Sequence, residues 1–171
     1  MMNIDELVHT YSDYLYRIAY SYVKDEQAAE EVVQDVFFKF YRTSTQFEGD
    51  AHLKTYLTRM VINRSYDYLR SWKHRKNTIF EVFHSKRPGV DHEVLEQSDS
   101  ETILKSVLAL PVKHREAIIL YYYEDLQIKE IAEMLELNES TVKSRLQRGR
   151  AQMKDTLQAT EWEVLKDGQS I

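Results

Sequence analysis

The stretch from 127 to 150 constrains the fold most, because its pattern predicts two helices separated by a tight turn. Apolar residues recur at helical spacing in its first half, at Ile128, Ile131 and Leu135. They recur in and after its second half, at Val142, Leu146, Met153 and Leu157. Between the halves, Leu137 supplies an apolar residue for the turn, and Asn138 is expected to cap the second helix through its side-chain oxygen. The stretch therefore predicts a helix-turn-helix.

The second predicted helix carries a polar and basic face. With Val142 and Leu146 against the core, a rotation of about 100° per residue turns a set of mostly polar side chains outward. They are Ser140, Lys143, Ser144, Gln147, Arg148 and Ala151, flanked by Arg145 and Arg150. Gln, Ser and Arg can read base edges in a major groove, and long cationic side chains reach phosphates. The alternative is a solvated basic helix that touches nothing, but the combination of helix, turn and basic face favours DNA binding.

The composition predicts an all-α protein. Four Gly and two Pro in 171 residues, with few alternating apolar stretches, leave little sign of strands or tight hairpins. An apolar content of 43% and a charged content of 30% argue against wholesale disorder. The absence of cysteine excludes disulfides and thiolate metal sites. Since the N-terminus lacks the pattern of a signal peptide and no apolar run has membrane-spanning length, a cytoplasmic protein is expected.

The remaining apolar periodicity predicts two small helical domains joined by a flexible linker. Helices are expected at 4–23, at 26–42 with Asp25 as cap, and at roughly 51–72. A capping-box pattern at 98–101 starts a further helix, and Pro111 starts another that reaches Glu124. The predicted division is a domain at 1–76, a linker at 77–97 containing Pro88-Gly89, a domain at 98–158 and a tail at 159–171.

Charge is distributed unevenly along a chain whose net charge is −5. Residues 25–35 include five acids and no base, whereas residues 52–76 include seven Lys/Arg and the single acid Asp67. Within the second stretch, Lys54, Thr55, Arg59, Asn63, Tyr66 and Arg70 share one helical side, near a loop that carries Phe47. Aromatic rings interleaved with cations suit single-stranded nucleic acid. The alternative is that Phe47 and the tyrosines pack in the loop and the core. Taken alone, this pattern favours packing over nucleic-acid binding.

Catalysis is not expected. The six histidines lack metal-ligand spacing, and there is no Gly-rich phosphate loop or Gly-x-Ser-x-Gly motif. Glu30, Glu31 and Asp35 share a helix face, but acid–base chemistry needs a pocket that shifts their pKa values. A solvated or partner-binding surface is the favoured interpretation of these acids. We expect neither cofactor nor metal nor small-molecule substrate.

Several motifs together resemble a known family. The segments 29–37, 47–50 and 54–57, with Asn63, resemble the second conserved region of bacterial sigma factors. The segments 110–117, 128–133 and 140–150 resemble the fourth region. The length and the absence of other domains resemble the small extracytoplasmic-function (ECF) subgroup. The resemblance covers nearly the whole chain except the linker and the tail.

This resemblance implies partners and contact residues. A core RNA polymerase surface, at the clamp, would be met by Glu31, Gln34, Asp35, Phe37 and Phe38. The minus-ten promoter element would be melted and held by Phe47, Lys54, Thr55, Tyr56, Arg59 and Asn63, with Phe47 and Asn63 around a flipped-out base. The minus-thirty-five element would be read by Ser140, Thr141, Lys143, Ser144, Arg145, Gln147 and Arg148. The family also implies contact with the polymerase flap and an anti-sigma factor as a further partner.

The chain departs from the family pattern at four positions. Tyr56 stands where Trp is usual, and Glu48 stands where Arg is frequent. Glu136 and Ser140 replace glycines, so the turn's backbone is expected to differ slightly. Two other classes of protein remain open: a regulator whose N-terminal helices dimerise or sense a signal, and a helical adaptor that binds protein and no DNA.

Overall fold

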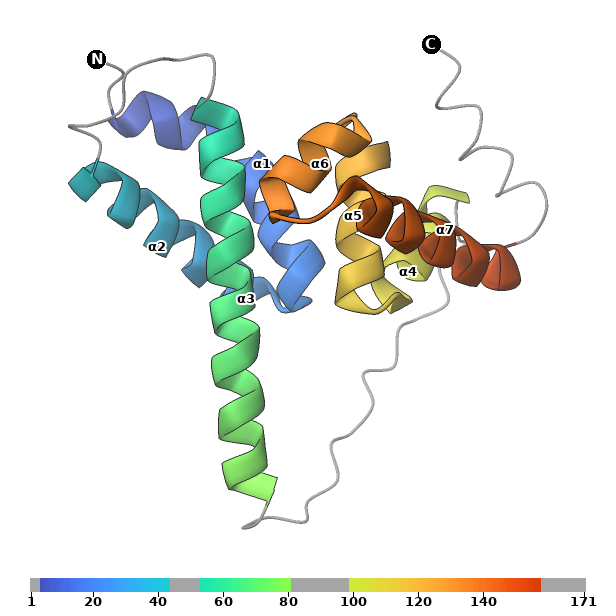
Figure 1. The fold of residues 1–171 in the computed structure, drawn as a ribbon. Coiled ribbons are helices and arrows are strands. Elements are labelled where there is room, and N and C mark those ends of the chain that lie inside the picture. Colours follow the sequence, from blue (N-terminus) through green and yellow to red (C-terminus); the bar gives the residue numbers. More distant parts are fainter. Residues whose placement is uncertain (1–3, 44–52, 81–98, 158–171) are drawn as a thin grey trace. The chain divides into compact units, whose positions relative to one another are not determined.

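The computed structural model describes residues 4–43, 53–80 and 99–157 (Figure 1). Within these ranges the chain forms seven α-helices and no strand, which confirms the all-α prediction. The chain divides into two compact units, residues 1–89 and residues 90–171.

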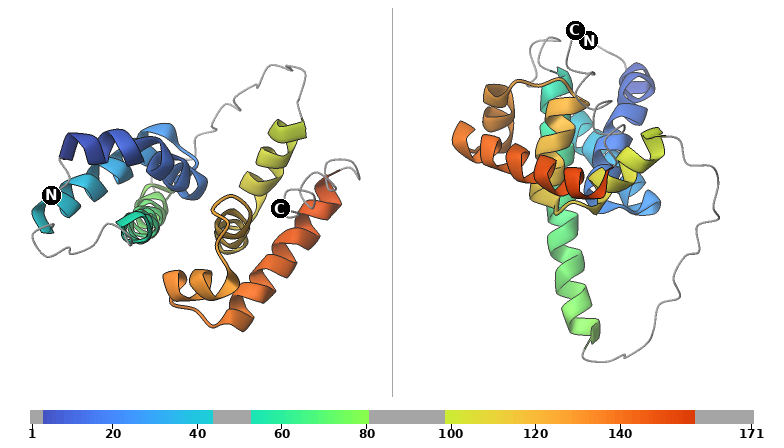
Figure 2. Two further views of the ribbon diagram at one scale, coloured as in Figure 1. Left: turned by 90° about the horizontal axis from the view of Figure 1, so that it is seen from above. Right: turned by 90° about the vertical axis from the view of Figure 1, so that its right-hand side faces the viewer.

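The first unit is built from α1 (Ile4–Val23), α2 (Glu26–Thr43) and α3 (Leu53–Phe80), each packed against the other two (Figure 2). Its core is the apolar stripes of the three helices: Leu7, Leu15, Ile18, Ala19, Tyr22, Ala29, Val32, Val36, Leu53, Leu57 and Val61. The predicted cap of α2 is present, since Ala28 N donates to Asp25 Oδ1 at 2.8 Å. The bounds predicted for α1 are confirmed, and α2 ends one residue later than predicted.

The third helix is longer than the sequence pattern predicts. It ends at Phe80 rather than at Trp72, so the helix continues past position 77, where the predicted linker begins (Figure 1). Residues 73–80 contain neither Gly nor Pro, so nothing in the backbone chemistry stops the helix. The prediction ended it where the apolar stripe fades, but a helix can continue beyond the part of it that is buried. The rest of the predicted linker and the predicted tail lie outside the described residues.

The second unit contains α4 (Asp99–Ala109), α5 (Val112–Tyr122), α6 (Ile128–Leu135) and α7 (Glu139–Thr156), with α5 packed against the other three. Pro111 is the N-cap of α5, and the helix ends at Tyr122, two residues before the predicted Glu124. Helices α5 and α7 approach closely at Gly149, where an added Cβ would lie 2.9 Å from Ile118 Cγ1. A larger side chain at 149 would therefore push α7 away from α5.

Helices α6 and α7 form the predicted helix-turn-helix. Gln127 N donates to Glu130 Oε2 at 2.7 Å at the start of α6. After α6, Glu136 adopts the left-handed conformation with φ 54°, which glycine would adopt without strain. Asn138 is the N-cap of α7 as predicted, but the predicted capping by its side-chain oxygen is wrong, because that side chain makes no capping hydrogen bond. The first turn is closed through its carbonyl oxygen, which accepts from Thr141 N at 3.0 Å and Val142 N at 3.2 Å.

Candidate functional site

Helix α7 separates a buried side from a polar outer side. Val142, Leu146, Gly149 and Met153 are buried against the rest of the unit. The predicted outer residues lie on the opposite side. Ser140, Lys143, Gln147, Arg148 and Ala151 are exposed, while Thr141 and Ser144 are half-buried. The predicted outer face, which is the candidate reading face, is therefore present as a strip of mostly polar side chains along the first turns of the helix.

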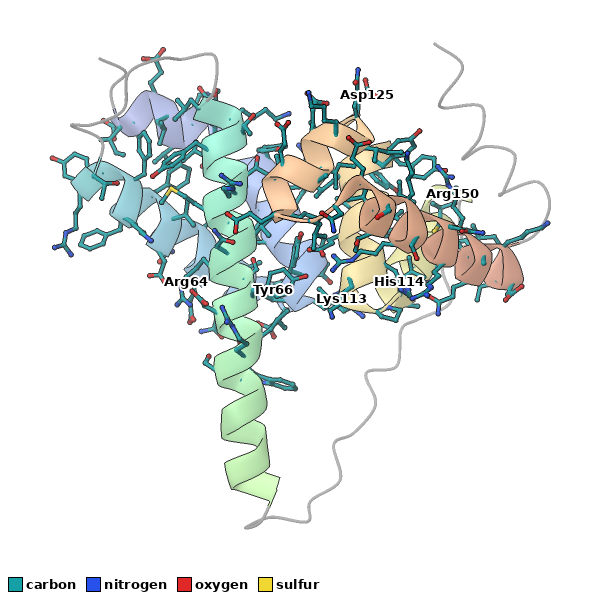
Figure 3. The ribbon with its side chains drawn as sticks, viewed as in Figure 1. Arg64, Tyr66, Lys113, His114, Asp125 and Arg150 are labelled. Atoms are coloured by element: carbon teal, nitrogen blue, oxygen red, sulfur yellow. The ribbon has the colours of Figure 1, made fainter. Side chains whose placement is uncertain are left out.

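A hollow borders this strip, lined by Lys113 and His114 from α5 and by Ser140, Thr141, Ser144, Arg145 and Arg148 from α7. Figure 3 labels Lys113 and His114 on α5. All seven lining residues are basic or carry a hydroxyl. The sequence reasoning missed Lys113 and His114, because they come from a helix outside the helix-turn-helix. Their position was a usable signal, since cations in the first turn of a helix oppose its macrodipole and so do little for the helix itself.

Arg145 is engaged within the protein. Its Nη1 donates to Glu116 Oε1 at 2.5 Å, and the two side chains are 16% and 2% exposed, respectively. An arginine in this position is needed to neutralise a buried carboxylate. The prediction that Arg145 contacts the minus-thirty-five element therefore competes with an internal ion pair that joins α5 to α7.

Arg150, predicted to flank the reading face, also connects α7 to α5. Its Nε donates to Tyr122 Oη at 2.7 Å, and its guanidinium carbon lies 5.4 Å and 5.5 Å from the ring centres of Tyr121 and Tyr122. Arg115 closes the corner between α4 and α5 by donating to the carbonyls of Leu108 and Leu110 at 2.9 Å and 3.1 Å. These arginines orient helices, whereas Arg148 is exposed on the reading face.

In the first unit, the candidate minus-ten residues lie along α3. Thr55, Arg59 and Asn63 are four residues apart and so share one stripe, with Lys54 and Tyr56 to either side. Lys54 Nζ lies 4.2 Å above the ring of Tyr14. Phe47 and Glu48 lie outside the described residues.

Asn63 lies where two open hollows adjoin. One is lined by Asn63, Tyr66, Asp67 and Arg70, and the other by Asp35, Val36, Lys39, Met60, Asn63, Arg64 and Asp67. An exposed amide in this position can offer a donor and an acceptor to a base edge. Asp67 lines both hollows, and its Oδ1 lies 2.5 Å from Nη2 of Arg70.

The candidate polymerase-binding residues of α2 fall on two sides of the helix. Glu31, Gln34, Asp35 and Phe38 are exposed, and Phe38 is 64% exposed. The side chain of Phe37 is only 8% exposed, because it follows the inner stripe one turn after Val33. The structure thus places Phe37 in the core and not on the predicted surface.

Three features of this surface were not anticipated from the sequence. Arg64 donates from Nε to Asp35 Oδ2 at 2.7 Å, and its Nη2 lies 2.6 Å from the same oxygen. Tyr41 is 63% exposed near the end of α2, and Arg42 lies 5.8 Å from the ring centre of Phe38. Exposed aromatic rings beside arginine are typical of protein interfaces. A search for apolar periodicity finds buried aromatics and gives no weight to exposed ones.

Two further properties concern the part of the chain that the structure describes. No three His, Asp or Glu residues there are grouped so that they could hold a metal ion. None of the described helices combines the length and the apolar character needed to cross a membrane.

Comparisons with known proteins match both units. The family model for Sigma-70 region 2 matches residues 7–75, and that for Sigma-70, region 4 matches residues 100–153. The ECF RNA polymerase sigma factor SigM of Bacillus subtilis is 30% identical over 159 residues, covering 90% of this chain and 94% of its own length. SigW of the same organism, also an ECF RNA polymerase sigma factor, is 29% identical over 163 residues, covering 89% and 87%.

Solved structures share the fold. The sigma factor RpoE of Bartonella quintana, solved with the anti-sigma factor NepR, superposes with a TM-score of 0.71 at 23% identity, covering 91% of this chain and 96% of its own. CnrH, solved with the cytosolic domain of CnrY, has a TM-score of 0.60 at 22% identity, covering 89% and 85%.

Proposed function

Because this chain belongs to the ECF RNA polymerase sigma factors, and is therefore a transcription initiation factor that directs RNA polymerase to promoters, we propose that its two units carry separate contact surfaces. The first unit binds core polymerase and the minus-ten element. The second unit binds the minus-thirty-five element.

The polymerase surface is the outer side of α2, made of Glu31, Gln34, Asp35 and Phe38 and extended here by Tyr41. Exposed Phe and Tyr side chains supply apolar area that is buried on binding, and the neighbouring acids attract a basic partner. Its partner is the polymerase clamp. Phe37 supports this surface from within the core.

The minus-ten surface is the stripe Thr55–Arg59–Asn63 with Lys54 and Tyr56. Extruding a base from a duplex costs a few kcal/mol, which a protein recovers by stacking and by hydrogen bonds to the base edge. The Asn63 amide, exposed between two hollows, supplies such bonds. Phe47 supplies the stacking, and the cations Lys54 and Arg59 hold the strand.

The minus-thirty-five surface is the outer side of α7. The observation that carries this assignment is the exposed strip opposite the buried Gly149 side, with Lys143, Gln147 and Arg148 exposed along it. Arg148 and Gln147 meet base edges, while Ser140, Thr141, Lys143 and Ser144 position the helix on the backbone. Arg145 is assigned as an anchor rather than a reader.

The fold neighbours RpoE and CnrH were solved with an anti-sigma factor and with the cytosolic domain of CnrY, respectively. We infer that an anti-sigma factor is a further partner of this chain. The chain acts in the cytoplasm with RNA polymerase, contacting its clamp and flap, and contributes no catalytic step, cofactor or small-molecule site of its own.

Run-off transcription with purified core polymerase tests this proposal. Adding the chain should allow initiation from a subset of promoters, which core polymerase alone does not use. DNA binding without core polymerase, combined with no initiation in its presence, would instead support the helix-turn-helix regulator. The Arg148→Ala variant should weaken upstream promoter binding by about 1–3 kcal/mol and relax base preference. An unchanged upstream footprint would contradict the face assigned to α7.

A further inference from the structure

We propose that the start of α5, at Lys113 and His114, forms a seat for one DNA backbone phosphate next to Arg148 and the reading face of α7. This inference rests on the proposed function and deepens it, because it places a DNA contact on a helix outside the helix-turn-helix. The seat positions α7 on the duplex and does not read sequence.

The chemistry of the hollow is that of a phosphate site. Lys113 and Arg148 provide nitrogen donors, and Ser140, Thr141 and Ser144 provide hydroxyls. Lys113 and His114 are labelled in Figure 3. Among the residues that the structure describes, no Asp or Glu lines the hollow. The charge of Arg145, which also lines it, is balanced by Glu116, so the excess positive charge comes from Lys113 and Arg148. A phosphodiester carries one negative charge and two exposed oxygens, which this set of donors matches.

The start of α5 is held against α7, so a phosphate bound there would fix the position of the reading helix. His114 Nδ1 lies 3.1 Å from Gln152 Oε1 and donates to it. The Cβ of His114 lies 3.6 Å from the position of a Cβ added to Gly149, where the two helices approach closely. Lys113 and His114 therefore belong to the same rigid surface as Gln147 and Arg148.

His114 bonds to Gln152, but the fold gives no comparable reason for a cation at Lys113. The N-terminal end of a helix carries partial positive charge, so the Lys113 ammonium in the first turn of α5 is electrostatically unfavourable. A phosphate bound in the hollow removes this repulsion. The competing interpretation is that Lys113 is a solvated cation with no DNA contact.

The test uses holoenzyme assembled from core polymerase and the full chain, with a short duplex that carries the minus-thirty-five element. Single phosphates in the duplex are replaced one at a time by uncharged methylphosphonates. Lys113→Ala is compared with wild type and with Lys105→Ala, a matched control that also removes one charge. Lys105 lies on α4, where it pairs with Glu101 at 3.0 Å.

We expect one methylphosphonate position to weaken wild-type binding several-fold and to have no further effect on Lys113→Ala, as in a double-mutant cycle. The plot of log affinity against log salt should become shallower by about one unit for Lys113→Ala and stay unchanged for Lys105→Ala. The loss of DNA affinity caused by Lys113→Ala should be the same on duplexes with altered minus-thirty-five bases. Lys113→Arg should restore both the weakening by that methylphosphonate and the wild-type slope of log affinity against log salt.

If Lys113→Ala responds to every methylphosphonate as wild type does, the phosphate seat is overturned while the reading face of α7 is not. If wild-type holoenzyme shows no dependence on the minus-thirty-five sequence, the proposed function of α7 fails and the seat fails with it. Circular dichroism of each variant should be unchanged, because Lys113 is exposed.

Discussion

Substituting Arg145 with Ala should abolish promoter binding by unfolding the second unit, not by removing a base contact. Arg145 neutralises Glu116, whose side chain is 2% exposed, through a 2.5 Å contact. Removing one partner of a buried ion pair costs about 3–5 kcal/mol, because the other charge is left buried. Arg145 keeps 16% exposure, which places the loss near the lower end of that range. A core of this size rarely supplies more than about 3–5 kcal/mol, so the loss is comparable with the whole stability of the unit.

The double substitution Glu116→Met with Arg145→Leu separates the two explanations. Replacing a buried pair by apolar side chains of similar volume is often neutral or stabilising, by about 1–4 kcal/mol. The double variant should therefore recover the stability that each single substitution loses. In a double-mutant cycle, the coupling between the two positions should exceed about 2 kcal/mol, within the range found for contacting residues.

The assay is thermal and urea unfolding of the full chain followed by far-UV circular dichroism, run beside binding of a minus-thirty-five duplex by holoenzyme. Arg148→Ala is the matched control, because it removes an exposed arginine from the same helix and should change stability by less than about 0.5 kcal/mol. The reasoning is refuted if Arg145→Ala unfolds at the wild-type temperature and yet loses minus-thirty-five recognition. That result would make Arg145 a reader of DNA.

Three further predictions concern other surfaces. Asn63→Ala should impair open-complex formation while core binding stays intact, and normal permanganate reactivity of the minus-ten region would contradict the role of its amide. Phe38→Ala should weaken polymerase binding by about 1–2 kcal/mol without loss of stability, whereas Phe37→Ala should destabilise the first unit by about 3–5 kcal/mol. Competition binding to core polymerase and urea unfolding distinguish the two, and equal behaviour would overturn the division of α2 into two sides. Glu136→Gly should stabilise the second unit by about 1 kcal/mol, because glycine relieves the φ of 54°, and a lower unfolding midpoint would show that Glu136 makes compensating contacts.

The sequence predicts helices well where burial and capping act together. The first helix and the start of the second follow from an apolar stripe and the Asp25 cap, both of which are local. The end of α3 does not follow, because the apolar periodicity of the sequence fades after Trp72 and no Gly or Pro marks a stop. Apolar periodicity reports burial, and a helix can outlast the part of it that is buried.

The same limit explains what the sequence could say of the site. Periodicity gives the rotation of α7 and hence its outer face, but not the partner that a flanking side chain meets across the next helix. Glu116 resembles any surface acid in a helical pattern, so its pairing with Arg145 is visible only in three dimensions. The sequence also does not show that Lys113 and His114 line the hollow beside α7. A contact between two helices leaves no pattern in the sequence of either helix.

The anchors of α7 explain how its reading side chains can be held in one orientation by a short helix-turn-helix. Arg145, Gly149 and Arg150 meet Glu116, Ile118 and Tyr122 of α5, so the contacts are distributed along both helices. Because these contacts combine an ion pair, a close backbone approach and a hydrogen bond, a rotation of α7 by one residue, about 100°, would break all three at once. The orientation of Gln147 and Arg148 is therefore set by α5 and depends little on their own identities. Changes at these exposed positions can alter which bases are read without disturbing the fold that presents them.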